Sequence, residues 1–167
     1  RSRFLPRWSM RYYKYDMPKI KIQKLKDYFA KREEVVMAFL FGSRARGLSS
    51  KISDWDIAVY IKSYGRKIEF EKNDKDFPEA SKIWSDLADI LETDSVDLII
   101  LNRTTANIAD SAVREGKPLV IKDRKLYLEF LLKISREAED YRKTVKEYAE
   151  VYWRSASLNE KDAEIIN

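Results

Sequence analysis

The residues whose types and spacing suggest chemistry are Gly42-Ser43 and, after a further ten residues, Asp54-Trp55-Asp56. The apolar run Val35–Phe41 precedes the glycine and predicts a buried strand that ends there. Glycine lets a ligand approach the backbone closely, and the backbone N–H groups that follow such a turn favour phosphate. The Ser43 hydroxyl adds another donor, so we predict a nucleotide-binding turn at Gly42 and Ser43.

Two cations follow this turn at Arg44 and Arg46. Guanidinium groups can neutralise a polyphosphate, so we add both residues to the predicted nucleotide-binding set. The turn is not a P-loop, because no Gly-Lys-Ser/Thr follows Gly42, and the Gly-x-Gly-x-x-Gly dinucleotide fingerprint is absent.

Asp54 and Asp56 are two residues apart at the start of a second predicted strand, Trp55–Ile61, so their side chains point to the same face. Two adjacent carboxylates repel each other unless a cation lies between them, and Mg²⁺ prefers oxygen ligands shared with substrate phosphates. Asp97 begins a third predicted strand, Val96–Leu101, and completes a carboxylate trio if that strand pairs beside the second. We predict that Asp54, Asp56 and Asp97 are the catalytic residues and hold two Mg²⁺ ions, which can stabilise an in-line displacement.

Each part of this pattern also has an ordinary explanation. A lone Gly-Ser is usually a turn, a lone Asp-x-Asp is usually a pair of solvated loop acids, and an Arg pair is usually surface charge. The joint pattern is much rarer, because it requires two apolar strands, the Gly-Ser turn and a third acid in order. We therefore interpret the combination as a site.

The composition excludes several other chemistries. The chain of 167 residues has no Cys and no His, which removes thiol nucleophiles, thiolate zinc sites and Ser-His-Asp hydrolysis. No apolar run approaches the roughly 18 residues that span a bilayer, so we expect a cytoplasmic protein without membrane contact. Residues 1–26 carry nine Lys or Arg and one acid, whereas the rest is net acidic. Since the basicity is confined to this arm, we do not expect direct nucleic-acid binding.

Hydrophobic periodicity predicts alternating helices and short strands. Further helices are expected at 20–32, 80–91 and 104–115, a short fourth strand at 119–121, and a long helix from Asp123 to about Arg154. This order predicts an α/β (α+β) fold with a small mixed β-sheet flanked by helices. We divide the chain into an extended basic arm (1–18), a catalytic domain (19–123) and a C-terminal helical extension (124–167).

The motif resembles the signature of the DNA polymerase beta superfamily of nucleotidyltransferases. Within it, the Gly-Ser-Arg-Ala-Arg-Gly form (residues 42–47), the segment 114–119 and the long C-terminal helix are similar to the minimal nucleotidyltransferase (MNT) antitoxins, partners of HEPN ribonuclease toxins. The resemblance implies the polymerase-beta-like fold over roughly residues 20–150.

Position by position, the resemblance implies that Gly42 and Ser43 hold the triphosphate of ATP and that Arg46 contacts phosphate. It implies that Asp54 and Asp56 bind both metal ions, and that Asp97 ligates the catalytic metal and helps to deprotonate the attacking hydroxyl. The implied reaction is transfer of AMP from ATP to a tyrosine of a HEPN toxin, which silences the toxin.

Two alternatives stay open at this point. One is a small-molecule adenylyltransferase of the antibiotic-modifying kind, which needs a larger C-terminal domain or a dimer to build its acceptor pocket. The other is an antitoxin that only binds its partner. The intact acidic trio argues against it, because clustered carboxylates without a cation are costly.

The long C-terminal helix carries one continuous apolar and aromatic seam with spacings of three and four. Its members are Tyr127, Phe130, Ile134, Ala138, Tyr141, Val145, Tyr148 and Tyr152. A domain of this size cannot cover the whole seam. Either its second half is simply solvated, or Tyr141–Tyr152 docks a helix of a partner.

Overall fold

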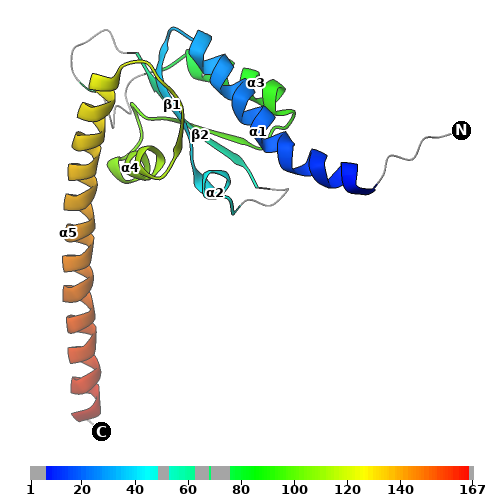
Figure 1. The fold of residues 1–167 in the computed structure, drawn as a ribbon. Helices are drawn as coiled ribbons and strands as arrows, with labels where there is room; N and C mark the ends of the chain where they lie inside the picture. The colour runs from blue at the N-terminus through cyan, green and yellow to red at the C-terminus, as the bar shows by residue number, and fades with distance from the viewer. Residues whose placement is uncertain (1–6, 49–52, 63–67, 69–75, 166–167) are drawn as a thin grey trace, which may run out of the picture.

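The computed structural model describes the backbone of residues 7–48, 53–62, 68 and 76–165, and the side chains of 19–48, 53–62, 68 and 76–151. Figure 1 shows the order of the elements along the chain. They are α1 (Arg7–Lys31), β1 (Val35–Leu40), α2 (Gly42–Ala45), β2 (Trp55–Ile61), α3 (Glu79–Leu91), β3 (Val96–Ile100), α4 (Ala106–Arg114), β4 (Lys117–Ile121) and α5 (Arg124–Ile165).

The four strands form one mixed sheet in the order β3-β2-β1-β4. β1 is antiparallel to both β2 and β4, whereas β2 and β3 run parallel, with α3 in the connection between them. The predicted small mixed sheet flanked by helices is confirmed.

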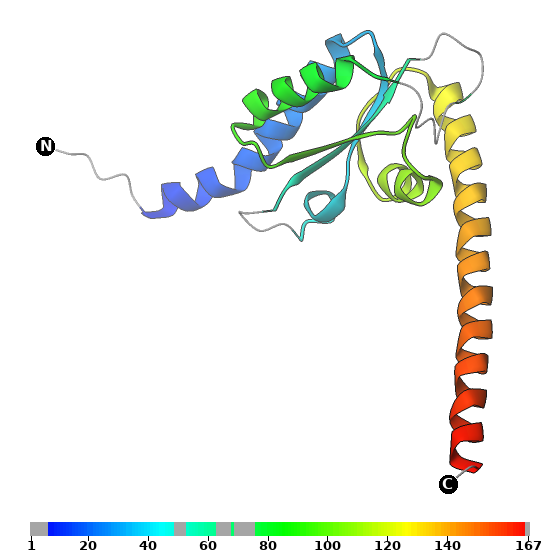
Figure 2. The same ribbon diagram turned by 180° about the vertical axis from the view of Figure 1, so that it is seen from behind.

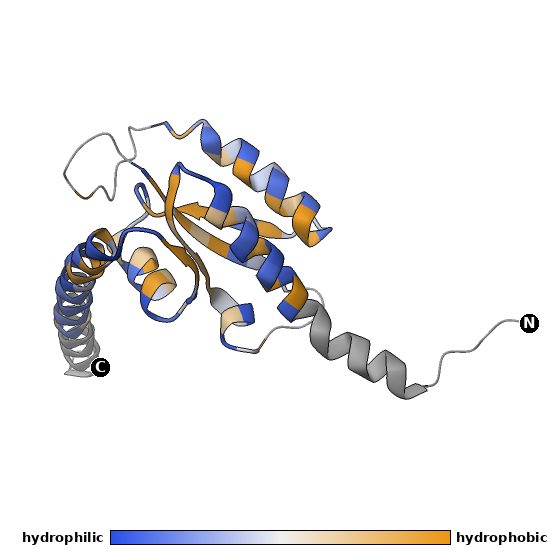
Figure 3. Cartoon of the chain, turned by 45° about the horizontal axis from the view of Figure 1, so that its top comes forward, coloured by the Kyte–Doolittle hydropathy of each residue, from blue (hydrophilic) through white to orange (hydrophobic). Residues whose placement is uncertain are grey.

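Helices cover both faces of this sheet. Alternate strand residues divide between the faces: Ala38 and Ile57 pack with α1 and α3, while Phe39 and Tyr60 pack with α4 and α5. This two-residue alternation is what a sheet buried on both sides requires. Figure 2 shows the two helical layers from behind, and Figure 3 shows apolar residues gathered on the sheet between them.

The strand predictions agree with the structure to within two residues at each end. The largest difference is β4, which begins at Lys117 and includes Pro118, opposite Phe39 of β1. A proline lacks the N–H donor of a central strand, but β4 lies at the edge of the sheet, where this loss is tolerated.

The expectation of an extended arm over residues 1–18 is wrong for residues 7–18, because α1 already begins at Arg7 and runs through Pro18. In Figure 1 the first turns of α1 project beyond the sheet. The sequence of these residues has no clear hydrophobic period, so the pattern did not predict a helix there. Residues 1–6 lie outside the described part of the chain.

α5 is longer than predicted, with 42 residues ending at Ile165 instead of near Arg154. Its length is about 63 Å at 1.5 Å per residue. Phe130, Ile134 and Ala138 are fully buried against the domain. Toward its C-terminus, the helix extends beyond the rest of the domain (Figure 1). None of the described helices is long and apolar enough to cross a membrane.

Candidate nucleotide and metal site

The three predicted acids meet at one end of the sheet. Asp54 directly precedes β2, Asp56 is its second residue, and Asp97 is the second residue of β3. β2 and β3 pair, which is the condition on which the predicted trio depended, and Asp56 stands opposite Asp97 in their parallel register. Alternation along the strands turns Asp56 and Asp97 to the face that α4 covers.

Gly42 is in direct contact with Asp56. The Gly42 backbone has φ +69°, and a Cβ on this residue would overlap the Asp56 carboxylate. The Phe41 N–H also donates to the Asp56 carbonyl oxygen at 2.9 Å. Only glycine combines this backbone conformation with so close an approach. The Gly-Ser turn and the acids, ten residues apart in sequence, therefore form one site.

Ser43 is half-buried at the start of α2, next to Gly42. Its carbonyl oxygen accepts a hydrogen bond from the Leu48 N–H at 3.0 Å, which closes the loop after α2. The backbone around Ser43 is thereby fixed next to Gly42 and Asp56.

Asp56 is under electrostatic strain. Partial burial, together with the nearby carboxylates of Asp97 and Asp54, raises the pKa of Asp56 above its ordinary value, and Arg44 and Arg46 offset part of this effect. A cation at this position would relieve the repulsion.

Arg44 holds the backbone that carries the acids. Its Nε donates to the carbonyl oxygens of Ser53 at 3.1 Å and Asp54 at 3.0 Å, and its terminal nitrogen also donates to Ser53. The guanidinium carbon lies 4.4 Å from the centre of the Trp55 ring. These donors and the cation–π contact fix Arg44 on the acidic loop. Sequence reasoning missed this role, since a long side chain leaves no periodic signal of its partner.

Arg46 lies at the rim of the site. Its Nη1 is 3.5 Å from a carboxylate oxygen of Glu115, just after α4, and both side chains are about half exposed. Arg46 still acts on Asp56 through its charge. It is therefore the more accessible of the two predicted phosphate-binding arginines.

The donor chemistry is suited to Mg²⁺ bound together with a nucleotide. Within the described residues, no three acidic, histidine or cysteine side chains converge closely enough to hold a metal ion by themselves. Mg²⁺ rarely needs such a cage, because it usually takes one or two carboxylates and completes its shell with phosphate oxygens and water. Asp56 with one neighbouring acid could supply those protein ligands, so the metal site stays a prediction.

A family model described as "Polymerase beta, Nucleotidyltransferase" matches residues 23–125. This match covers more than half of the chain and includes the Gly-Ser turn and all three acids. The chain therefore belongs to the polymerase beta nucleotidyltransferase family and carries a nucleotidyltransferase domain. No curated protein matches it significantly.

Solved structures with the same fold include a chain of a toxin–antitoxin complex with AMP-PNP. It is 22% identical, with a TM-score of 0.59, and the match covers 80% of this chain and 96% of that one. A second is a chain from a structure described as tri-AMPylated Shewanella oneidensis HEPN toxin in complex with MNT antitoxin. It is 18% identical, with a TM-score of 0.59, and the match covers 82% of this chain and 99% of that one. At such identities the likeness establishes the shared fold.

Proposed function

We propose that this chain is an MNT-type antitoxin that transfers AMP from ATP to a tyrosine hydroxyl of a HEPN toxin. The observation that carries the proposal is the contact of Gly42 with the strained carboxylate of Asp56, beside Asp97. Structural neighbours add support, since one contains AMP-PNP and another an AMPylated HEPN toxin with an MNT antitoxin.

In this proposal Gly42 and Ser43 bind the triphosphate through the backbone and the serine hydroxyl, while Asp54, Asp56 and Asp97 hold the metal. Two Mg²⁺ ions, when bound, would supply positive charge at the reacting phosphate and the leaving pyrophosphate.

Residues of the chain itself are proposed to assist the transfer step. The tyrosine oxygen forms a bond to the α-phosphorus of ATP as the bond to the β-phosphate oxygen breaks, so pyrophosphate leaves. Asp97, more exposed than Asp56, accepts the tyrosine proton in this scheme. Arg44 acts by positioning, because it already holds the carbonyl groups of Ser53 and Asp54.

The test is incubation of the chain with ATP, Mg²⁺ and the candidate HEPN partner from the neighbouring reading frame of its operon, followed by intact mass measurement of that protein. We expect the mass to rise by one or more AMP groups with the wild type and to stay unchanged with Asp54→Asn/Asp56→Asn. An unmodified HEPN protein in both reactions would contradict the enzymatic proposal. If its ribonuclease activity were nonetheless blocked, an antitoxin that only binds would replace it.

A further inference from the structure

The distal part of α5 presents an uncovered apolar stripe, defined here as Tyr141, Val145 and Tyr148. These side chains are 58%, 48% and 74% exposed. Their spacing of four and three places them on one side of the helix. The same side is fully buried upstream, at Phe130 and Ile134. The stripe is therefore the continuation of a packing surface beyond the domain.

A pocket of about 380 Å³ lies at the upstream end of the stripe, between the start of α4 and α5. Asn107, Glu137, Asp140 and Tyr141 are among the residues that line it. The Oδ1 atom of Asn107 is buried and has no hydrogen-bond partner among the described residues. The two acids of this lining, Glu137 and Asp140, attract a positively charged donor, as a Lys or Arg side chain provides.

A second copy of this chain is a poor occupant. Asp140 and Glu147 lie along one edge of the stripe, and Arg142 and Lys146 along the other. In an antiparallel symmetric pair each edge would face its own copy, so acids would meet acids. A parallel pair is blocked, because α4 already occupies the same side of α5 upstream.

We propose that the stripe docks a helix of a different protein, which covers Tyr141, Val145 and Tyr148 and inserts a Lys or Arg side chain into the pocket. Charge complementarity selects the orientation, since basic residues of that helix meet Asp140 and Glu147. This inference rests on the proposed function, under which the partner is the HEPN toxin. The position of the stripe leaves the acidic end of the sheet free for the acceptor tyrosine.

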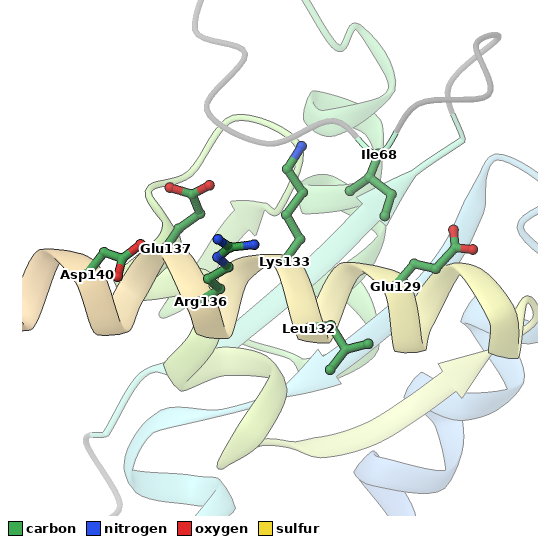
Figure 4. A pocket seen from close by; sticks show the side chains of 7 residues that line it. All are labelled: Ile68, Glu129, Leu132, Lys133, Arg136, Glu137 and Asp140. Carbon is green, nitrogen blue, oxygen red and sulfur yellow. The ribbon is translucent and has the colours of Figure 1, made fainter.

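The experiment measures the affinity of the full chain for the HEPN-domain protein of its operon by calorimetry. Val145→Asp/Tyr148→Asp should weaken binding at least about a hundredfold, because buried aromatic contacts dominate helix docking. Asp140→Lys should weaken it by about tenfold and reduce its dependence on salt. The matched control is Leu132→Asp, since Leu132 is 72% exposed and projects from α5 on the side opposite Glu137 (Figure 4). This control should bind like the wild type.

Three results would overturn the inference. The first is wild-type affinity in Val145→Asp/Tyr148→Asp, or no binding by the wild type itself. The second is an equal loss in Leu132→Asp, which would indicate a general effect on the helix. The third is self-association of the chain that Val145→Asp abolishes, seen by sedimentation. Asp54→Asn/Asp56→Asn should bind the HEPN-domain protein with wild-type affinity while losing AMP transfer. Failure of the docking inference can therefore be distinguished from failure of the proposed activity.

Discussion

Asp56 is a partly buried carboxylate and Asp110 a buried one, and their surroundings are opposite. Asp110 in α4 accepts hydrogen bonds from Ser135 at 2.9 Å and Arg114 at 3.2 Å, and Arg142 lies 3.5 Å away. Partial burial raises the pKa of Asp56, and the two neighbouring acids raise it further, while Arg44 and Arg46 offset only part of this effect. Asp110 therefore ties α4 to α5, whereas the charge of Asp56 is only partly compensated.

This difference separates stability from function. A buried charge with partners on all sides serves the fold, and removing one partner is costly. A carboxylate held among other carboxylates does not stabilise the fold, which agrees with our proposal that a cation binds there together with a ligand. The following variants test whether the cluster of Asp54, Asp56 and Asp97 affects activity alone and the hydrogen-bond network of Asp110 affects stability alone.

Gly42→Ala should have the largest effect, and it should fall on activity. The added Cβ would overlap the Asp56 carboxylate, and alanine disfavours φ +69°. We expect AMP transfer to fall on the order of a thousandfold, because displaced metal ligands lose their alignment. Gly47→Ala is the matched control, since Gly47 has φ +74° but nothing within 4 Å of an added Cβ. Equal losses in both variants would mean that backbone strain, not the contact with Asp56, is responsible.

Asp110→Ala should have its effect on stability instead. It leaves Arg114 and Ser135 without their shared acceptor, and we expect the free energy of unfolding to fall by about 2–3 kcal/mol, measured by urea denaturation. Activity per folded molecule should be unchanged. A loss of transfer in the fully folded variant would show that the α4–α5 network also positions the acids.

Arg44→Lys should reduce the rate of AMP transfer by about ten- to a hundredfold, because it disturbs the position of the acids. Lysine cannot hold two carbonyl groups and stack on Trp55 together, so Asp54 would lose its fixed position. The measurement is Mn²⁺ affinity and kcat, beside ATP affinity without metal. If Arg44 positions the acids, the variant should have lower Mn²⁺ affinity and lower kcat but unchanged ATP affinity without metal. If Arg44 contacts phosphate, ATP affinity without metal should fall as well.

The contrast between these regions also decides what the sequence could predict. The strands were predictable because residues buried on both faces form short apolar runs. The sequence placed Asp97 near the start of a strand, but the pairing that brings it to Asp56 is shown by the structure. The partners of Arg44 and Asp110 were not predictable, since they depend on how loops and helices pack. The helical turns before Pro18 were missed because their sequence shows no clear hydrophobic period.

Asp56→Asn should stabilise the metal-free protein slightly. The folded pKa of Asp56 is raised above the unfolded value, so ionisation disfavours the fold. The wild type should match the variant below the unfolded pKa of about 3.9. The wild type should become less stable as the pH rises, with the full difference above the folded pKa. The side chain is partly exposed, so we expect less than about 1 kcal/mol in thermal unfolding with EDTA. A destabilised variant at neutral pH would contradict the strain at Asp56.

Glu115→Gln should have the smallest effect. The Arg46–Glu115 pair is half exposed, so its loss should change stability by less than about 0.5 kcal/mol. If Arg46 is the phosphate cation, freeing it should tighten ATP binding a few-fold, and Arg46→Ala should weaken binding by a similar factor. Both are measured by equilibrium titration with a nonhydrolysable ATP analogue. Opposite shifts in the two variants would place Arg46 in the site, while unchanged affinity in both would leave it as a surface ion pair.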